Sequence, residues 1–230
     1  MKIVAIILAG GRGTRIGTEV PKQFLKVVGK SMIIHCLELY DKIKEVDEIY
    51  LSVNERFQKK CQALLGKHKI KKLIKVVPGG KVRQDTIRNA FHEITGADRI
   101  VIQNAVSPTV SEILVGKCIK ASKRNNVVTA YLPAFHTVFE RYPSRIKKVL
   151  KRKSLGYACD PQVFQTRVLE DIFKKVRKGL SGDIPMLEST MRLGHKVHLV
   201  ESEPENIKTT FWHDVSAIES VLRMRKNSSE

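Results

Sequence analysis

The sequence has few acidic and few aromatic residues. Its 230 residues include 23 aspartates and glutamates against 42 lysines and arginines, and only 6% are aromatic. The net charge of +19 favours polyanionic partners, with a nucleic acid and a triphosphate substrate as the two candidates. Because we find no RNP signature, zinc finger or aromatic ladder interleaved with the charge, we do not expect nucleic-acid binding.

Cysteines and long apolar runs are also scarce. The four cysteines form no CxxC pair and no Cys/His cluster with zinc-ligand spacing, so we expect reduced thiols, mostly in or near the core. No apolar run approaches the roughly 20 residues of a spanning helix. The short run from Ile3 to Leu8 lacks the cleavage site of a signal peptide. We therefore expect a cytoplasmic protein without a membrane segment.

Short apolar runs alternate with amphipathic stretches along the chain. Residues 3–8 have the pattern of a buried strand, and residues 31–41 that of a helix with Ser31 as its N-cap. The same patterns predict strands at 48–53, 72–77, 99–103, 127–132 and 196–200, a strand at 163–165, and helices at 55–65, 83–94, 111–123, 167–178, 184–193 and 213–224. This order predicts one α/β domain over residues 1–230, with a Rossmann-like, mostly parallel sheet and helices on both faces.

Residues 134–158 interrupt this alternation. They contain Pro143, are rich in basic and aromatic residues, and lack a clear helical face. A β-arm that projects from the sheet fits this composition better than a core helix, and an ordinary surface loop fits it about as well as the arm.

A glycine-rich segment, Leu8-Ala9-Gly10-Gly11-Arg12-Gly13-Thr14-Arg15, follows the first predicted strand. Its glycines allow the backbone to approach a ligand closely, and its N–H groups can bind phosphate oxygens. Arg12 and Arg15 add forked donors that suit phosphate. The segment matches neither the P-loop nor the usual dinucleotide pattern. Alone, it would fit a tight βα turn about as well as a ligand site.

The segment becomes more specific together with Pro21-Lys22-Gln23-Phe24-Leu25. The pair resembles the sugar-nucleotide pyrophosphorylases and, more narrowly, the cytidylyltransferases that act on ribitol 5-phosphate or 2-C-methyl-D-erythritol 4-phosphate. The resemblance covers nearly the whole chain. It implies the nucleotide-diphospho-sugar transferase fold, CTP and a sugar- or polyol-phosphate as substrates, and Mg²⁺ as cofactor. It also implies a homodimer in which the arm, residues 134–158, completes the neighbouring subunit's site.

The resemblance assigns candidate residues to three groups. Arg15, Lys22 and Lys208, the last in Asn206-Ile207-Lys208, would be the catalytic cations around the phosphates. The implied nucleotide-binding residues are Leu8, Ala9, Gly10, Gly11, Gly13, Gly79, Gly80, Arg83, Thr86, Asn104 and Ala105. The implied acceptor-phosphate residues are Thr137 and Arg152. Taken in isolation, Thr86 also fits a helix start, and Arg152 also fits one charge in a basic run.

The chain departs from the family's pattern in two segments, at three polar positions of the first and at one position of the second. Where the family reads His-Asp-Ala-Ala/Val-Arg-Pro, this chain has Gln103-Asn104-Ala105-Val106-Ser107-Pro108, and where the family reads Thr-Pro-Gln it has Asp160-Pro161-Gln162. The family's aspartate holds the ribose and a divalent ion. Asn104, the metal-ligand candidate here, can still hydrogen-bond a hydroxyl but brings no negative charge.

The first function that this comparison predicts is CDP-ribitol formation from CTP and D-ribitol 5-phosphate. Leu-Ala-Gly-Gly, Pro-Lys-Gln-Phe-Leu and Ala105-Val106 favour that branch, because the methylerythritol branch more often opens with Ala-Ala-Gly. The 2-C-methyl-D-erythritol 4-phosphate reaction of isoprenoid synthesis is the second candidate. The changes at Asn104 and Ser107 also allow a catalytically impaired nucleotide-binding paralogue, and nucleic-acid binding is a further alternative.

Overall fold

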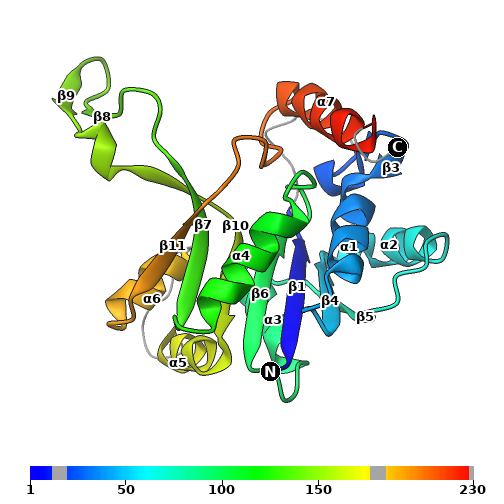
Figure 1. Cartoon of the computed structure of the whole chain (residues 1–230). Coiled ribbons are helices and arrows are strands. Elements are labelled where there is room, and N and C mark those ends of the chain that lie inside the picture. The colour runs from blue at the N-terminus through cyan, green and yellow to red at the C-terminus, as the bar shows by residue number, and fades with distance from the viewer. Residues whose placement is uncertain (12–19, 177–184, 228–230) are drawn as a thin grey trace.

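A seven-stranded sheet forms the centre of the protein in the computed structural model, which describes residues 1–11, 20–176 and 185–227 (Figure 1). Its strands lie in the order β11-β7-β10-β6-β1-β4-β5. They are β1 (Ile3–Ala9), β4 (Glu48–Val53), β5 (Leu73–Pro78), β6 (Arg99–Asn104), β7 (Val127–Pro133), β10 (Gly156–Gln165) and β11 (Val197–Glu201). Only β10 is antiparallel to its neighbours, so the prediction of a mostly parallel sheet is confirmed.

Helices cover both faces of the sheet, as predicted (Figure 1). They are α1 (Met32–Lys42), α2 (Gln58–Leu65), α3 (Arg83–His92), α4 (Glu112–Ser122), α5 (Thr166–Val176), α6 (Met186–Arg192) and α7 (His213–Asn227). Side chains of β1 alternate between the faces, because a strand has a period of two. Ile3, Ala5 and Ile7 pack in the core with α1 and α4, whereas Val4 and Ile6 pack with α3 and α5.

The predicted helix 55–65 begins later than expected. Its first turn is a 3₁₀ helix, η2 (Glu55–Phe57), because the side chain of Asn54 accepts a hydrogen bond from the backbone N–H of Arg56 and tightens the turn. The shared direction of all strands except β10 places their carboxyl ends at one edge of the sheet. The segments that follow β1, β4, β5 and β6 therefore meet there, where ligands bind in such sheets.

The segment 134–158 contains a hairpin, which is one of the two alternatives that the sequence left open. Strands β8 (Phe139–Arg141) and β9 (Ile146–Val149) pair antiparallel and project away from the sheet (Figure 1). Every residue of both strands is exposed. The arm is shorter than predicted, because Gly156, Tyr157 and Ala158 pair with β7 and belong to β10.

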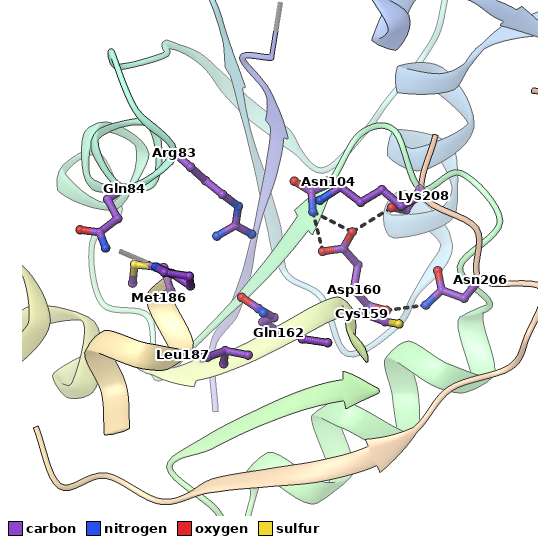
Figure 2. A pocket seen from close by; sticks show the side chains of 13 residues that line it. Arg83, Gln84, Asn104, Cys159, Asp160, Gln162, Met186, Leu187, Asn206 and Lys208 are labelled. Atoms are coloured by element: carbon purple, nitrogen blue, oxygen red, sulfur yellow. Dashed lines mark hydrogen bonds between the residues drawn. The ribbon is translucent and has the colours of Figure 1, made fainter. Parts of the chain in front are cut away.

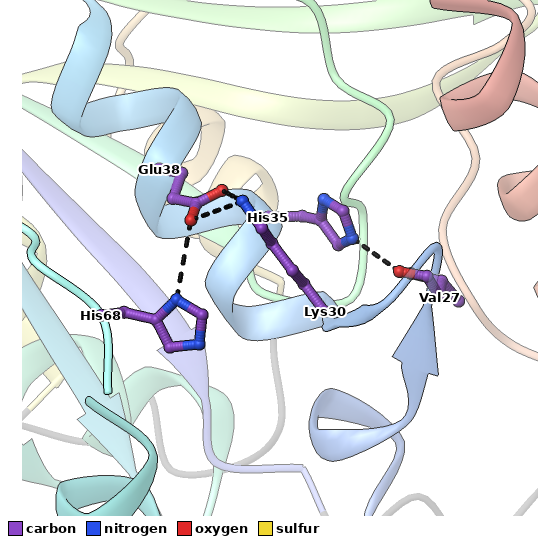
Figure 3. A network of polar contacts seen from close by, with 5 residues as sticks. All are labelled: Val27, Lys30, His35, Glu38 and His68. Carbon is purple, nitrogen blue, oxygen red and sulfur yellow. Dashed lines mark hydrogen bonds and ion pairs between the residues drawn. The ribbon is translucent and has the colours of Figure 1, made fainter. Parts of the chain in front are cut away.

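A small hairpin, β2 (Lys26–Val27) with β3 (Lys30–Ser31), attaches the segment around Lys22 to α1. Lys30 Nζ donates to both carboxylate oxygens of Glu38, and His35 Nε2 lies 2.7 Å from the carbonyl oxygen of Val27 (Figure 3). Burial lowers the pKa of His35 below its ordinary value of 6.5. Near neutral pH, a neutral imidazole of α1 is therefore hydrogen-bonded to the hairpin at Val27.

The cysteines agree with the expectation of core thiols. All four are free; Cys36, Cys61 and Cys118 are buried, and Cys159 is half-buried. Burial raises the pKa of Cys61 to about 11 and that of Cys118 to about 12, so both remain protonated at neutral pH. Among the described helices, none is both long and apolar enough to span a membrane.

Candidate active site

A cleft of about 700 Å³ lies at the carboxyl edge of the sheet. The segments that follow β1, β4, β5 and β6 form its walls, together with two lysines from distant parts of the chain. The lining residues are Leu8, Ala9, Gly10, Gly11, Lys22, Gln23, Asn54, Glu55, Arg56, Gly79, Gly80, Lys81, Val82, Arg83, Thr86, Asn104, Val106 and Lys208. The fold thus gathers most of the predicted nucleotide-binding residues into one cleft.

The turn at Gly79-Gly80 packs closely on the start of α3. A Cβ atom on Gly80 would lie 2.2 Å from Asp85 Cβ and 2.9 Å from the backbone nitrogen of Thr86. The hydroxyl of Thr86 accepts a hydrogen bond from the Gly80 N–H at 3.0 Å and donates to the carbonyl of Val82 at 3.1 Å. Only glycine fits at position 80, and Thr86 fixes the turn from the helix side.

The first glycine segment lies beside the same threonine. A Cβ atom on Gly10 would lie 3.6 Å from both Thr86 Oγ1 and Thr86 Cγ2, which is an ordinary contact distance. The two glycine segments, which are about seventy residues apart in sequence, therefore form adjacent walls of the cleft.

Lys22 and Lys208 enter the cleft from two segments that are hydrogen-bonded to each other. Lys22 Nζ donates to the carbonyl of Thr209 at 2.8 Å, and the Thr209 N–H donates to the carbonyl of Val106 at 2.8 Å. Gln23 is buried and donates through Nε2 to the carbonyl of Ala9 at 2.8 Å. These bonds bring both ammonium groups to the glycine segments, where phosphate oxygens would meet them.

A second hollow of about 350 Å³ adjoins the cleft and shares Arg83, Asn104 and Lys208 with it (Figure 2). Asp160 lies in its wall with only 6% of its surface exposed. Asn104 Nδ2 donates to both carboxylate oxygens of Asp160 at 2.8 Å, and the hydroxyl of Ser107 donates to one of them at 2.8 Å.

The sequence comparison assigned no role to Asp160. Two changes from the family's pattern could have pointed to Asp160: the chain loses the family's aspartate at 104 and gains an aspartate at 160. Asn206 contributes to the same cluster, because its Nδ2 donates to the backbone carbonyl of Asp160 at 2.6 Å. The hollow also contains Gln84, Gln162, Met186 and Leu187, none of which was predicted.

A buried hydrogen-bond chain supports Asn104 and Ser107 from behind. The hydroxyl of Tyr40 donates to Gln103 Oε1 at 3.0 Å, and Gln103 Nε2 donates to the carbonyls of Asn104 at 3.1 Å and Ser107 at 3.4 Å. Tyr40 and Gln103 are both completely buried. Gln103, which replaces the family's histidine, therefore fixes the loop that contains Asn104 and Ser107, the other two changes in this segment.

The remaining predicted residues lie elsewhere. Ala105 is buried, donates its N–H to the carbonyl of Leu8 at 2.9 Å, and does not line either cavity. Thr137 and Arg152 are exposed on the arm, outside both cavities, and Arg152 Nη1 donates to the carbonyl of Phe135. Gly13 and Arg15 lie outside the described residues.

The residues around Asp160 fit a divalent ion whose coordination a ligand completes. No three His, Cys, Asp or Glu side chains among the described residues gather to form a metal cage. Mg²⁺, however, is usually held by one or two carboxylates together with substrate phosphates. Asp160 offers one buried carboxylate in the wall of the smaller hollow, beside the amide of Asn104, which lines both cavities.

The fold and the cleft together define a class of protein. A mostly parallel sheet, glycine-rich turns at its carboxyl edge and convergent lysines are the features of a nucleotidyltransferase of the nucleotide-diphospho-sugar transferase type. The chain belongs to the 2-C-methyl-D-erythritol 4-phosphate cytidylyltransferase (IspD) family, whose model matches residues 3–224. The resemblance that the motifs indicated is thereby confirmed.

Relatives with two different names resemble the chain to a similar degree. A ribitol-5-phosphate cytidylyltransferase of Lacticaseibacillus paracasei is 29% identical, and the match covers 97% of this chain and 99% of the relative. A 2-C-methyl-D-erythritol 4-phosphate cytidylyltransferase of Syntrophus aciditrophicus is 32% identical, with 96% of each chain covered. Both relatives are cytidylyltransferases, but their names give different acceptors, so sequence identity does not decide between the two acceptors.

Solved structures share the fold. The 4-diphosphocytidyl-2C-methyl-D-erythritol synthase of Anaerococcus prevotii superposes with a TM-score of 0.84 at 22% identity, covering 96% of each chain. The 2-C-methyl-D-erythritol 4-phosphate cytidylyltransferase of Thermus thermophilus superposes with a TM-score of 0.78 at 22% identity, covering 97% of this chain and all of the other.

Proposed function

We propose that this protein forms CDP-ribitol and pyrophosphate from CTP and D-ribitol 5-phosphate. The observation that carries the proposal is the cleft wall made by Leu8-Ala9-Gly10-Gly11 and Lys22-Gln23, whose sequence is typical of the ribitol-phosphate branch. Ala105-Val106 favours the same branch. The Lacticaseibacillus relative with this name, matched over nearly its whole length, adds support.

The reaction is a nucleotidyl transfer. A phosphate oxygen of the acceptor attacks the α-phosphorus of CTP, and the bond from that phosphorus to the bridging oxygen of pyrophosphate breaks. No enzyme group becomes covalently attached, so the protein acts by positioning and by charge stabilisation. Lys22 and Lys208 line the cleft at the place where negative charge accumulates, and we assign Arg15 the same task. A divalent ion, when bound, would neutralise phosphate charge.

The two cavities suggest where each substrate binds. The larger cleft has the glycine turns and takes the nucleotide, with the pyrimidine against the close-packed Gly79-Gly80 turn. The smaller hollow takes the acceptor and shares Lys208 with the cleft, so the α-phosphorus would lie at the boundary. Thr137 and Arg152 lie outside both cavities, which supports a homodimer whose arms complete the neighbour's acceptor site.

A second candidate acceptor is 2-C-methyl-D-erythritol 4-phosphate. The name of the matching family and that of the Syntrophus relative favour it. The deciding experiment measures pyrophosphate release by the purified protein from CTP with each acceptor in turn. We expect turnover with D-ribitol 5-phosphate; turnover with methylerythritol phosphate alone would overturn the proposal. Stabilisation by CTP without pyrophosphate release from either acceptor would indicate a nucleotide-binding paralogue.

A further inference from the structure

Asp160 and Asn104 occupy facing positions on two neighbouring antiparallel strands. In the ladder between β10 and β6, Gln162 pairs with Ile102 and Val163 pairs with Val101. Asp160 and Asn104 lie just beyond this pair, where β10 has an irregularity between Cys159 and Gln162. Their side chains meet there, with Asn104 Nδ2 2.8 Å from each carboxylate oxygen (Figure 2). A carboxylate and an amide thus share one cross-strand site.

Asp160 is unusual among the acidic residues of the described ranges, because it alone is buried. Within the described ranges, its carboxylate accepts hydrogen bonds from the neutral side chains of Asn104 and Ser107 alone, and no ion pair there involves it. A buried charge is costly unless it has a partner of opposite sign. A cation that enters the site together with a ligand would therefore be stabilised by the Asp160 carboxylate.

The geometry leaves room for such a cation. A carboxylate has about four lone-pair sites. Asn104 uses two of them and Ser107 one, so one site remains for a metal ion. The amide oxygen of Asn104 points away from Asp160 and offers a second oxygen donor at the boundary of the two cavities (Figure 2). Mg²⁺ accepts such a site when substrate phosphates supply the other ligands.

We propose that Asp160 is the carboxylate that binds the divalent ion of the metal–triphosphate complex in this chain. In this arrangement the negative charge sits on β10 instead of β6, and Asn104 orients the carboxylate. The pair keeps one negative charge, because the chain has an aspartate at 160 where the family has threonine, and an asparagine at 104 where the family has aspartate. The inference rests on the proposed use of CTP, but not on which acceptor is used.

The alternative is that Asp160 only fixes the loop from Asn104 to Ser107. The two roles predict opposite effects on CTP binding without metal. If Asp160 binds the ion, then D160N removes a charge that repels the triphosphate, and CTP binds in EDTA as well as before or more tightly. If Asp160 is only structural, then D160N disturbs the cleft and weakens CTP binding with and without metal.

The test measures Mn²⁺ binding by electron paramagnetic resonance in the presence of CTP, and CTP binding by calorimetry in Mg²⁺ and in EDTA. No acceptor is added, so failure of the ribitol-phosphate proposal leaves these results unaffected. The variants are D160N, N104D and the exchange N104D/D160N. The control is D171N, which removes one charge from Asp171, an exposed side chain of α5 outside both cavities.

We expect D160N to weaken Mn²⁺ binding about tenfold or more, because substitutions around a metal site typically lower metal affinity by about that factor. The exchange N104D/D160N should restore binding to within about threefold, and D171N should match the wild type. Mn²⁺ affinity of D160N within twofold of wild type would overturn the proposal, as would equal loss of CTP binding in Mg²⁺ and EDTA. If D160N does not fold, D160T decides instead, because threonine is the family's residue at this position and also removes the charge: a tenfold loss of Mn²⁺ binding supports the proposal, and affinity within twofold of wild type overturns it.

Discussion

Replacing Gly80 by alanine tests whether the base-side wall of the cleft requires a residue without a side chain. The backbone of Gly80 does not have a positive φ, so the requirement comes from space alone. The new Cβ atom would lie 2.2 Å from Asp85 Cβ and 2.8 Å from the Asp85 carbonyl carbon. Both belong to the first turn of α3, so relief requires movement of backbone. We expect the turn and the helix to separate and the hydrogen bond from Gly80 N–H to Thr86 to break.

The size of the effect follows from three contributions. Overpacking costs about 1–3 kcal/mol, and loss of the hydrogen bond costs about 1 kcal/mol. Alanine also restricts the unfolded chain, which stabilises the protein by about 0.4–1 kcal/mol. The free energy of unfolding should therefore fall by about 2 kcal/mol, which for a chain of this size lowers the melting temperature by about 4–8 °C.

Gly79 provides the matched control. A Cβ atom there would meet only ordinary contacts at 3.5 Å, with Val53 and Asn54. Gly79→Ala should change stability by between zero and a gain of about 1 kcal/mol, through the unfolded chain alone. The assay is urea unfolding of both variants at constant slope, together with CTP affinity. Equal unfolding free energies for the two variants, within about 0.5 kcal/mol, would refute the reasoning about Gly80.

Three further predictions concern a lysine of the cleft, a buried tyrosine and a histidine with a lowered pKa. Lys208→Met should lower pyrophosphate release about 10²–10³-fold in steady-state assays while the unfolding transition stays unchanged, because it removes a cation from the phosphate region; less than a threefold change would contradict this. Tyr40→Phe leaves buried Gln103 Oε1 without its donor and should cost about 1–3 kcal/mol in urea unfolding. His35 has a lowered folded pKa, so the unfolded state takes up its proton first, and stability should fall as pH drops through 6.5. The variant His35→Gln should flatten this pH dependence, and an unchanged slope would contradict the assignment.

Local patterns were enough to predict most elements of the fold. The run Ile3–Ala9 is apolar on both faces, as a central parallel strand must be, and the pattern of 48–53 matches β4 in full. The length of β10 was not predictable, because residues 156–162 have no apolar run and are ordered by pairing with β7 and β6. Tertiary hydrogen bonds thus override a weak local signal.

The candidate site divides in the same way. Glycine segments and lysines with family spacing identified the phosphate side, since each motif is continuous in sequence and carries its own chemistry. The position of Ala105 behind the cleft, rather than in it, depends on which face of the backbone points inward after β6. That choice is made by the bond to Leu8 on the neighbouring strand, which no local pattern records.

By itself, the sequence determined the family, the order of strands and helices, and the residues that would approach a triphosphate. Those properties depend on neighbours within a few positions, where periodicity and motif chemistry act. Only the tertiary structure decided that Asn104 and Asp160, 56 residues apart, meet across one antiparallel pair. Read along the chain, Asn104 is a lost charge; in the folded sheet its partner strand supplies that charge 2.8 Å away. The physical reason is that strand register, rather than sequence distance, sets which side chains share a site.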